Sequence, residues 1–178
     1  MTTLTVVESK IGSLLKEAEE LSKKDLHDEA LVICSAIIEQ HPDSFRAYEI
    51  RSSIFRRTGD LKRAVEDISH VIRLNPTSAA PLFRRGRYRM AEGHLKGAIE
   101  DFSNAMTLDS GYFGDALRLY RAEAFLRSGR YAKAISDCEA MSTNYGERNF
   151  FGHEHRSRAD IDADARAGWF RKGSSKPR

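Results

Sequence analysis

The sequence has few of the residues that interrupt helices or cross-link a chain. Its 178 residues include four prolines and two cysteines, Cys34 and Cys138. Because proline cannot donate to a helix ladder, its scarcity favours long helices. The two cysteines are far apart and form no Cys-x-x-Cys pair, which indicates inert, buried thiols in a reducing compartment.

Long apolar runs are also missing. No segment approaches the roughly 18 apolar residues that a membrane helix needs. The first ten residues lack the basic start and apolar stretch of a signal peptide. We therefore expect no membrane contact and a cytoplasmic location.

Motifs of the common enzyme classes do not occur. The chain has no phosphate-binding loop, dinucleotide fingerprint, G-x-S-x-G elbow or H-E-x-x-H zinc helix. His153 and His155 form the one histidine cluster, and two histidines without further ligands make a poor zinc site. We expect no enzyme activity, no metal and no cofactor.

Neither sign of charge dominates the composition. The 29 basic and 26 acidic residues leave a net charge of +3, and hydrophobic residues make up 40%, enough for a folded core. Arginines outnumber lysines by 20 to nine. Arginine pairs with planar carboxylates and stacks on aromatic rings better than lysine does. The alternative explanation of the excess is the base composition of the genome.

The sequence does contain a strong internal repeat. Alanines recur at steps of 34, 34 and 36 residues, and an apolar residue follows each of them four positions later. These alanines are Ala30, Ala64, Ala98 and Ala134. Turn glycines precede three of them (Gly59, Gly93 and Gly129), and prolines follow two (Pro42 and Pro76). Each unit is therefore predicted to form two helices and two turns.

Small residues complete the pattern at Ala18, Ser52, Gly86 and Ala122. With them, the chain resembles the tetratricopeptide repeat family. The resemblance implies an all-α fold, a helix-turn-helix repeat solenoid or alpha-alpha superhelix. It divides the chain into a lead-in (1–10), four repeats over 11–141 (11–44, 45–78, 79–112 and 115–141), and a turn, capping helix and frayed tail (142–178).

The expected capping helix begins at about Arg156. Its apolar residues Ile161, Ala165 and Trp169 fall at helical spacing, with aspartates early and basic residues late. We expect this helix to cover the open end of the fourth repeat. Two alternatives stay open, namely a disordered tail and docking of the aspartates in a basic groove.

Arginine and aspartate recur together in three repeats. The arginine lies in the first helix of each repeat, and the aspartate follows sixteen residues later in the second. We predict partly buried ion pairs at Arg51 with Asp67, Arg85 with Asp101, and Arg121 with Asp137. The alternative is that these arginines bind a ligand.

In the family that this chain resembles, the first helices of the repeats form a concave binding face. The matching positions here hold six arginines and several apolar residues. The predicted peptide-binding groove consists of Arg46, Ile50, Arg56, Arg57, Phe83, Arg84, Arg87, Met90, Leu119, Tyr120 and Arg127. Such a surface suits an acidic or mixed acidic-apolar peptide segment.

The expected function is a protein–protein interaction scaffold or adaptor, with a co-chaperone-like role as a variant, acting as a monomer. The carboxylate clamp of chaperone-tail adaptors is not matched, because only Arg84 fits among the corresponding residues Leu15, Glu19, Ile50, Ala80 and Arg84. The alternative function is nucleic-acid binding in the same basic groove, with Phe83 and Tyr120 stacking on bases.

Overall fold

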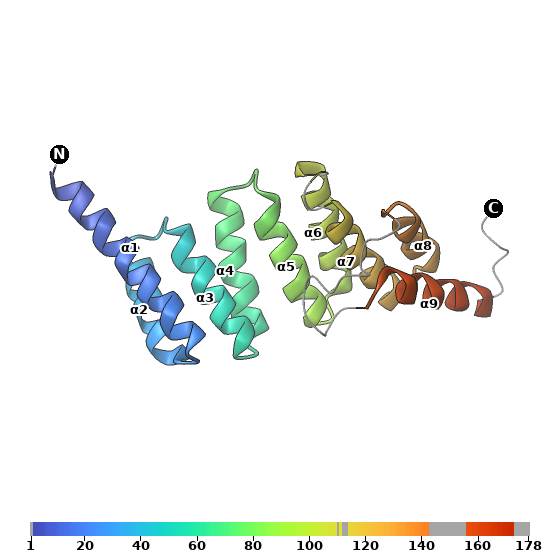
Figure 1. The fold of residues 1–178 in the computed structure, drawn as a ribbon, viewed down its shortest axis with the longest axis horizontal. Helices are drawn as coiled ribbons and strands as arrows, with labels where there is room; N and C mark the ends of the chain where they lie inside the picture. Colours follow the sequence, from blue (N-terminus) through green and yellow to red (C-terminus); the bar gives the residue numbers. More distant parts are fainter. Residues whose placement is uncertain (1, 110, 112–113, 143–155, 173–178) are drawn as a thin grey trace. The chain divides into compact units, whose positions relative to one another are not determined.

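The computed structural model describes residues 2–109, 111, 114–142 and 156–172, with side chains from residue 9 onward. This part of the chain is built of α-helices joined by short turns, which confirms the predicted all-α helical repeat fold (Figure 1). The helices are α1 (Thr2–Lys23), α2 (His27–Gln40), α3 (Phe45–Arg57), α4 (Leu61–Leu74), α5 (Ala79–Ala91), α6 (Leu95–Leu108), α7 (Gly114–Arg127), α8 (Tyr131–Glu139) and α9 (Arg158–Arg171).

The helices belong to two compact units, Met1–Thr77 and Ser78–Arg178. In the first unit, α1 packs on α2 and α3 packs on α4, while α2 and α1 also contact α3. In the second unit, α5 packs on α6, α7 on α8, and α9 on both α7 and α8. Consecutive helices therefore form antiparallel pairs, the unit that the repeat pattern predicts.

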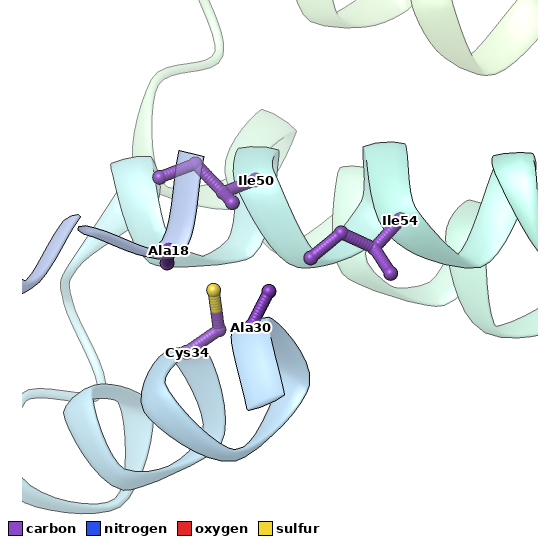
Figure 2. Close-up of a cluster of buried hydrophobic side chains, with 5 residues drawn as sticks. All are labelled: Ala18, Ala30, Cys34, Ile50 and Ile54. Atoms are coloured by element: carbon purple, nitrogen blue, oxygen red, sulfur yellow. The ribbon is translucent and has the colours of Figure 1, made fainter. Parts of the chain in front are cut away.

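The core of the first unit forms where three helices meet. Ala18 of α1, Ala30 and Cys34 of α2, and Ile50 and Ile54 of α3 make one buried cluster (Figure 2). Ala30 and Cys34 lie one turn apart and so face the same neighbours. The alanines are fully buried, and their small side chains allow α1 and α2 to approach closely.

Glycines reverse the chain between paired helices. Gly59, Gly93 and Gly129 have positive φ angles of 85°, 83° and 70°, in the left-handed region that glycine adopts without steric cost. The first repeat has Asp25 at this place, with a φ of 61°. Asp60 then caps α4, because its carboxylate accepts a hydrogen bond from the Arg63 backbone N–H at 3.0 Å.

The two ends of the chain add to the sequence-based picture. Helix α1 begins at Thr2, so the segment predicted as a lead-in is helical along most of its length. Of the predicted turn at 142–147, only Ser142 is described; residues 143–155, with His153 and His155, and the predicted frayed tail at 173–178 lie outside the described residues.

Helix α9 packs against the fourth helix pair. Ile161 is 1% exposed and lies in a cluster with Ala122, Cys138 and Met141. Ser157 forms a capping box with Asp160, so the helix begins two residues after the expected start.

The aspartates of this segment have partners within it. Asp162 accepts from Arg166 at 2.8 Å, and Asp164 pairs with Arg156. Their carboxylates are therefore engaged on their own helix and its N-terminal flank rather than in a basic groove.

Candidate peptide-binding surface

The repeated arginine–aspartate pairs form inside each repeat. Nε and Nη2 of Arg85 donate to the two carboxylate oxygens of Asp101 at 3.0 and 2.7 Å. The corresponding distances from Arg121 to Asp137 are 2.8 and 2.6 Å. Asp101 is 1% exposed and also accepts from Arg89 at 2.9 Å. These contacts confirm the predicted ion pairs and leave the three arginines occupied by the protein itself.

Two of the predicted groove arginines in the first unit have internal carboxylate partners. Arg46 pairs with Glu19 of α1, and it lies 3.5 Å from Glu49 on its own helix. Arg57 donates to the Ser22 carbonyl oxygen and to the Asp25 carboxylate, each at 2.5 Å. Arg57 thus satisfies a backbone acceptor near the end of α1 and secures the α1–α2 turn.

The other two predicted groove residues of the first unit differ in their surroundings. Ile50 is 7% exposed and belongs to the core cluster, so it offers little surface to a ligand. Arg56 is exposed, and no other residue in the described part of the chain forms a hydrogen bond or ion pair with it.

The second unit contains an aromatic cluster. The ring centroids of Phe83 on α5 and Tyr120 on α7 are 5.1 Å apart, in an edge-to-face arrangement. Phe102 of α6 completes the cluster, with centroids 6.0 Å from Phe83 and 5.9 Å from Tyr120. Phe102 was not among the predicted site residues; its aromatic ring at the position four after the repeat alanine, where other repeats have cysteine or isoleucine, was the available signal.

Arg87 covers this aromatic cluster. Its Cζ lies 5.8 Å from the Phe83 ring centroid and 5.2 Å from the Tyr120 ring centroid. Both distances fall in the range of cation–π attraction, which fixes the guanidinium above the rings. The structure thus brings three predicted site residues together in one place.

The remaining predicted residues of the second unit lie on α5 and α7, the first helices of its repeats. Met90 and Arg84 are half-buried on α5, and Arg127 is exposed at the end of α7. Leu119 packs against the cluster that contains Ile161 of α9. Only part of the Leu119 side chain therefore remains for a ligand.

The C-terminal segment reaches an acidic residue of α7. Nη1 of Arg156 lies 3.8 Å from Oε2 of Glu123, whose side chain is 20% exposed. Glu123 was not among the predicted site residues, and the sequence did not predict this pair. The pairing depends on the packing of α9, which no local pattern reveals.

The cysteines have the properties of core residues. Burial raises the pKa of the Cys34 thiol and of the Cys138 thiol to about 12. Both cysteines are free. At neutral pH they are therefore protonated and poor nucleophiles. The described residues hold no group of three or more histidine, cysteine, aspartate or glutamate side chains placed to bind a metal ion. In the same part of the chain, no helix has the length and hydropathy to cross a membrane.

Repeated pairs of helices, joined by glycine turns, define this chain as a helical repeat protein. The chain belongs to the tetratricopeptide repeat family, whose models match residues 45–78 and 82–146. Tetratricopeptide repeat protein 36 of Mus musculus is 30% identical, over 89% of this chain and 68% of the relative. DnaJ homolog subfamily C member 3 of Rattus norvegicus is 26% identical, over 64% of this chain but only 32% of its own length.

Solved structures show the same fold. YrrB, described as a TPR protein with an unusual peptide-binding site, has a TM-score of 0.74 at 16% identity, covering 98% of this chain and 84% of that chain. The first TPR of Spaghetti (RPAP3) bound to the HSP90 peptide SRMEEVD has a TM-score of 0.58 at 22% identity, covering 70% and 94%. The TPR2B domain of yeast Sti1 in its pHsp70 complex has a TM-score of 0.60 at 19% identity, covering 65% and 96%.

Proposed function

We propose that this chain is a protein-interaction adaptor that binds an acidic or mixed acidic-apolar segment of another protein along the first helices of its repeats. One observation carries the proposal. Arg56, Arg87 and Arg127 form no hydrogen bond or ion pair with another described residue, whereas Arg46 and Arg57, at other predicted groove positions, are paired. Each lies at a position that the family resemblance assigns to the concave face.

Unpaired arginines favour an acidic partner for an electrostatic reason. A carboxylate that approaches them gains attraction without breaking an existing ion pair, and it is steered there before contact. Half-buried Met90 and the accessible part of Leu119 supply apolar contacts within the second unit. The proposed ligand is therefore a segment with acidic residues and one or two apolar anchors.

Relatives support a chaperone-linked partner within this proposal. The peptide SRMEEVD, bound by the RPAP3 repeat domain, combines three acidic residues with methionine and valine. The Sti1 domain is described in a pHsp70 complex, and one relative carries a DnaJ name. Since Leu15, Ile50 and Ala80 replace the polar residues of a carboxylate clamp, we propose contacts with acidic side chains rather than with a chain terminus.

Affinity capture with matched charge reversals tests the proposal. The wild type is compared with Arg56→Glu/Arg127→Glu, and with a control, Arg73→Glu/Lys96→Glu, that reverses two exposed charges on second helices. Each bait is used with and without nuclease. The proposal predicts discrete proteins that the first variant loses, the control retains and nuclease does not affect.

Two other results would contradict it. An identical protein set from all baits would mean that this face is not the working surface. Captured material that disappears with nuclease would favour the nucleic-acid alternative, which the internal pairing of Arg46 and Arg57 makes less attractive because it reduces the positive charge available for phosphates.

We further propose that the adaptor is a monomer of a reducing compartment such as the cytoplasm. Two free cysteines buried in different repeats suit such a compartment. The packing of Ile161 against the fourth helix pair covers apolar surface that would otherwise favour association. Light scattering of the purified chain measures its mass directly, and a dimer mass would contradict the proposal.

A further inference from the structure

Arginines that stack on aromatic rings follow a rule within this protein. Arg51, Arg63, Arg87 and Arg121 lie over rings, and all of them except Arg87 also hold an aspartate. Arg51 stacks on Tyr48 and Phe55 and pairs with Asp67; Arg63 stacks on Phe55 and pairs with Asp60; Arg121 stacks on Phe125 and pairs with Asp137.

The two contacts are compatible because they use different parts of the guanidinium. A ring attracts the flat face of the group, whereas the N–H donors point outward in its plane. A carboxylate can therefore bind two of these donors side-on while the ring stays in place. Arg51 makes both kinds of contact, with its Cζ 5.6 and 5.9 Å from two ring centroids and its Nε and Nη2 2.9 and 2.8 Å from the carboxylate oxygens of Asp67.

Arg87 is the exception to the rule. It has the aromatic support of Phe83 and Tyr120 and is half-buried, but no acceptor within the described residues receives its N–H groups. The cation is thus oriented and partly removed from water, while its donors have no partner among the described residues. A carboxylate supplied by a ligand would give Arg87 the arrangement found at Arg51 and Arg121, namely a guanidinium that lies over a ring and also binds a carboxylate.

The geometry points to Arg87 as the receptor for one aspartate or glutamate side chain of the bound segment, held side-on while its neighbour in the segment packs on Met90. Met90 lies one turn further along α5, on the same face as Arg87. This inference rests on the proposed function. It adds which residue of the chain binds the acidic residue of the ligand, and which chemical group of the ligand is bound.

A side-chain carboxylate fits better than the other anions. A phosphate dianion is best held by several cations, whereas Arg87 offers one guanidinium. A terminal carboxylate is held by a clamp of several polar residues. The position at which that clamp has a lysine, in the same repeat as Arg84, is Ala80 in this chain. The carboxylates already held by stacked arginines in this protein are all aspartate side chains.

A displayed library of random 12-residue peptides, selected on the full chain, provides the probe. Enriched peptides are expected to share an acidic residue beside an apolar one. The best of them is then synthesised in four forms: unchanged, with its acidic residue replaced by the amide, with that residue replaced by phosphoserine, and with an amidated C-terminus. Affinities are measured for the wild type, Arg87→Gln and a matched control, Arg73→Gln, which alters an exposed arginine of the second helix α4, after thermal melts establish that the variants fold.

Because a side-on charged pair is lost, Arg87→Gln should weaken the unchanged peptide about tenfold or more. The acid-to-amide peptide should bind the wild type just as weakly, and Arg87→Gln should weaken it no further. Arg73→Gln and C-terminal amidation should change little, and the phosphoserine form should bind no better than the unchanged peptide.

The outcomes separate this inference from the proposed function. Enriched acidic peptides that bind Arg87→Gln as well as the wild type would overturn the role of Arg87 and leave the adaptor function standing. Loss of binding on C-terminal amidation, or a stronger phosphoserine form, would overturn the side-chain carboxylate. A selection that enriches no peptide would overturn both.

Discussion

Arg51 and Asp67 are joined side-on across the two helices of the second repeat. Nε and Nη2 of the arginine lie 2.9 and 2.8 Å from the two carboxylate oxygens. Nη1 of Arg51 donates at 3.2 Å to Oγ of Ser35, on α2 of the preceding repeat. Arg121 repeats the arrangement, with its Nη1 3.0 Å from Oγ of Ser103. One guanidinium therefore connects both helices of its own repeat with the repeat before it.

This connection predicts that Arg51→Leu destabilises the protein strongly. The Asp67 side chain is 6% exposed and would keep a charge without its partner, which costs about 2 to 4 kcal/mol of unfolding free energy. The double variant Arg51→Leu/Asp67→Leu should recover much of the loss, because it removes the stranded charge. Urea unfolding of the three proteins measures the loss and its recovery, and equal stability of the wild type and Arg51→Leu would show that the pair contributes nothing.

Two glycines should respond to alanine in opposite directions. At Gly86 a Cβ would lie 2.5 Å from Cε1 of the buried Phe102 ring, so Gly86→Ala forces the aromatic cluster apart and should cost about 1 to 3 kcal/mol. At Gly12 a Cβ meets nothing within 4 Å, and alanine in this helix should stabilise by up to about 1 kcal/mol. Thermal melts compare the two variants; a tolerant Gly86→Ala would mean that the ring can move aside.

The buried thiols predict a distinct dependence on pH. Ordinary thiols become reactive near pH 9, but Cys34 and Cys138 have pKa values raised to about 12 from 9.0. A neutral buried thiol contributes stability that is fully present below pH 9 and is lost as the pH rises toward about 12, because only the unfolded chain ionises over most of that range. Reaction with a thiol reagent should stay slow up to pH 10 and become fast in denaturant. Rapid native labelling of both residues at pH 8 would contradict this.

The packing of α9 should protect Cys138 from a thiol reagent, whereas it should not affect the reactivity of Cys34. The Cys138 Sγ lies 3.8 Å from the Arg158 carbonyl oxygen, and Arg158 Nε donates to the Cys138 carbonyl oxygen at 2.7 Å. Ile161→Asp places a charge in the cluster beneath α9, so the helix should detach and Cys138 should become reactive.

The matched control for this experiment is Ala159→Asp, which alters an exposed residue of the same helix. Mass spectrometry after thiol labelling distinguishes the two cysteines. Equal labelling of Cys34 and Cys138 in Ile161→Asp would indicate general unfolding instead of local detachment.

Much of the fold could be predicted from the sequence because its information is local and repeated. The alanine period sets the helix pairs, and a glycine such as Gly59 marks the left-handed turn between them. The pairing of Arg51 with Asp67 was also predictable, since residues that recur together on paired helices have few other partners within reach. Because the same pattern occurs in four repeats, each repeat independently supports the prediction of a helical repeat fold.

The candidate site was less predictable, because charge pairing depends on distances between side chains from different helices. Six arginines at concave positions suggested a uniformly basic groove, yet Arg46 pairs with Glu19 and Arg57 with Asp25. No local pattern distinguishes these arginines from Arg87.

The sequence alone determined the all-α repeat architecture, its turns and the three repeated arginine–aspartate pairs, because helical periodicity, turn chemistry and the repeat itself can be recognised from the sequence. Only the tertiary structure decided that Arg46 and Arg57 pair with acids of α1 and its turn, that Phe102 joins Phe83 and Tyr120 beneath Arg87, and that Arg156 approaches Glu123. Those relationships arise where helices distant in sequence pack together, and their energies depend on burial and on separations of a few ångströms.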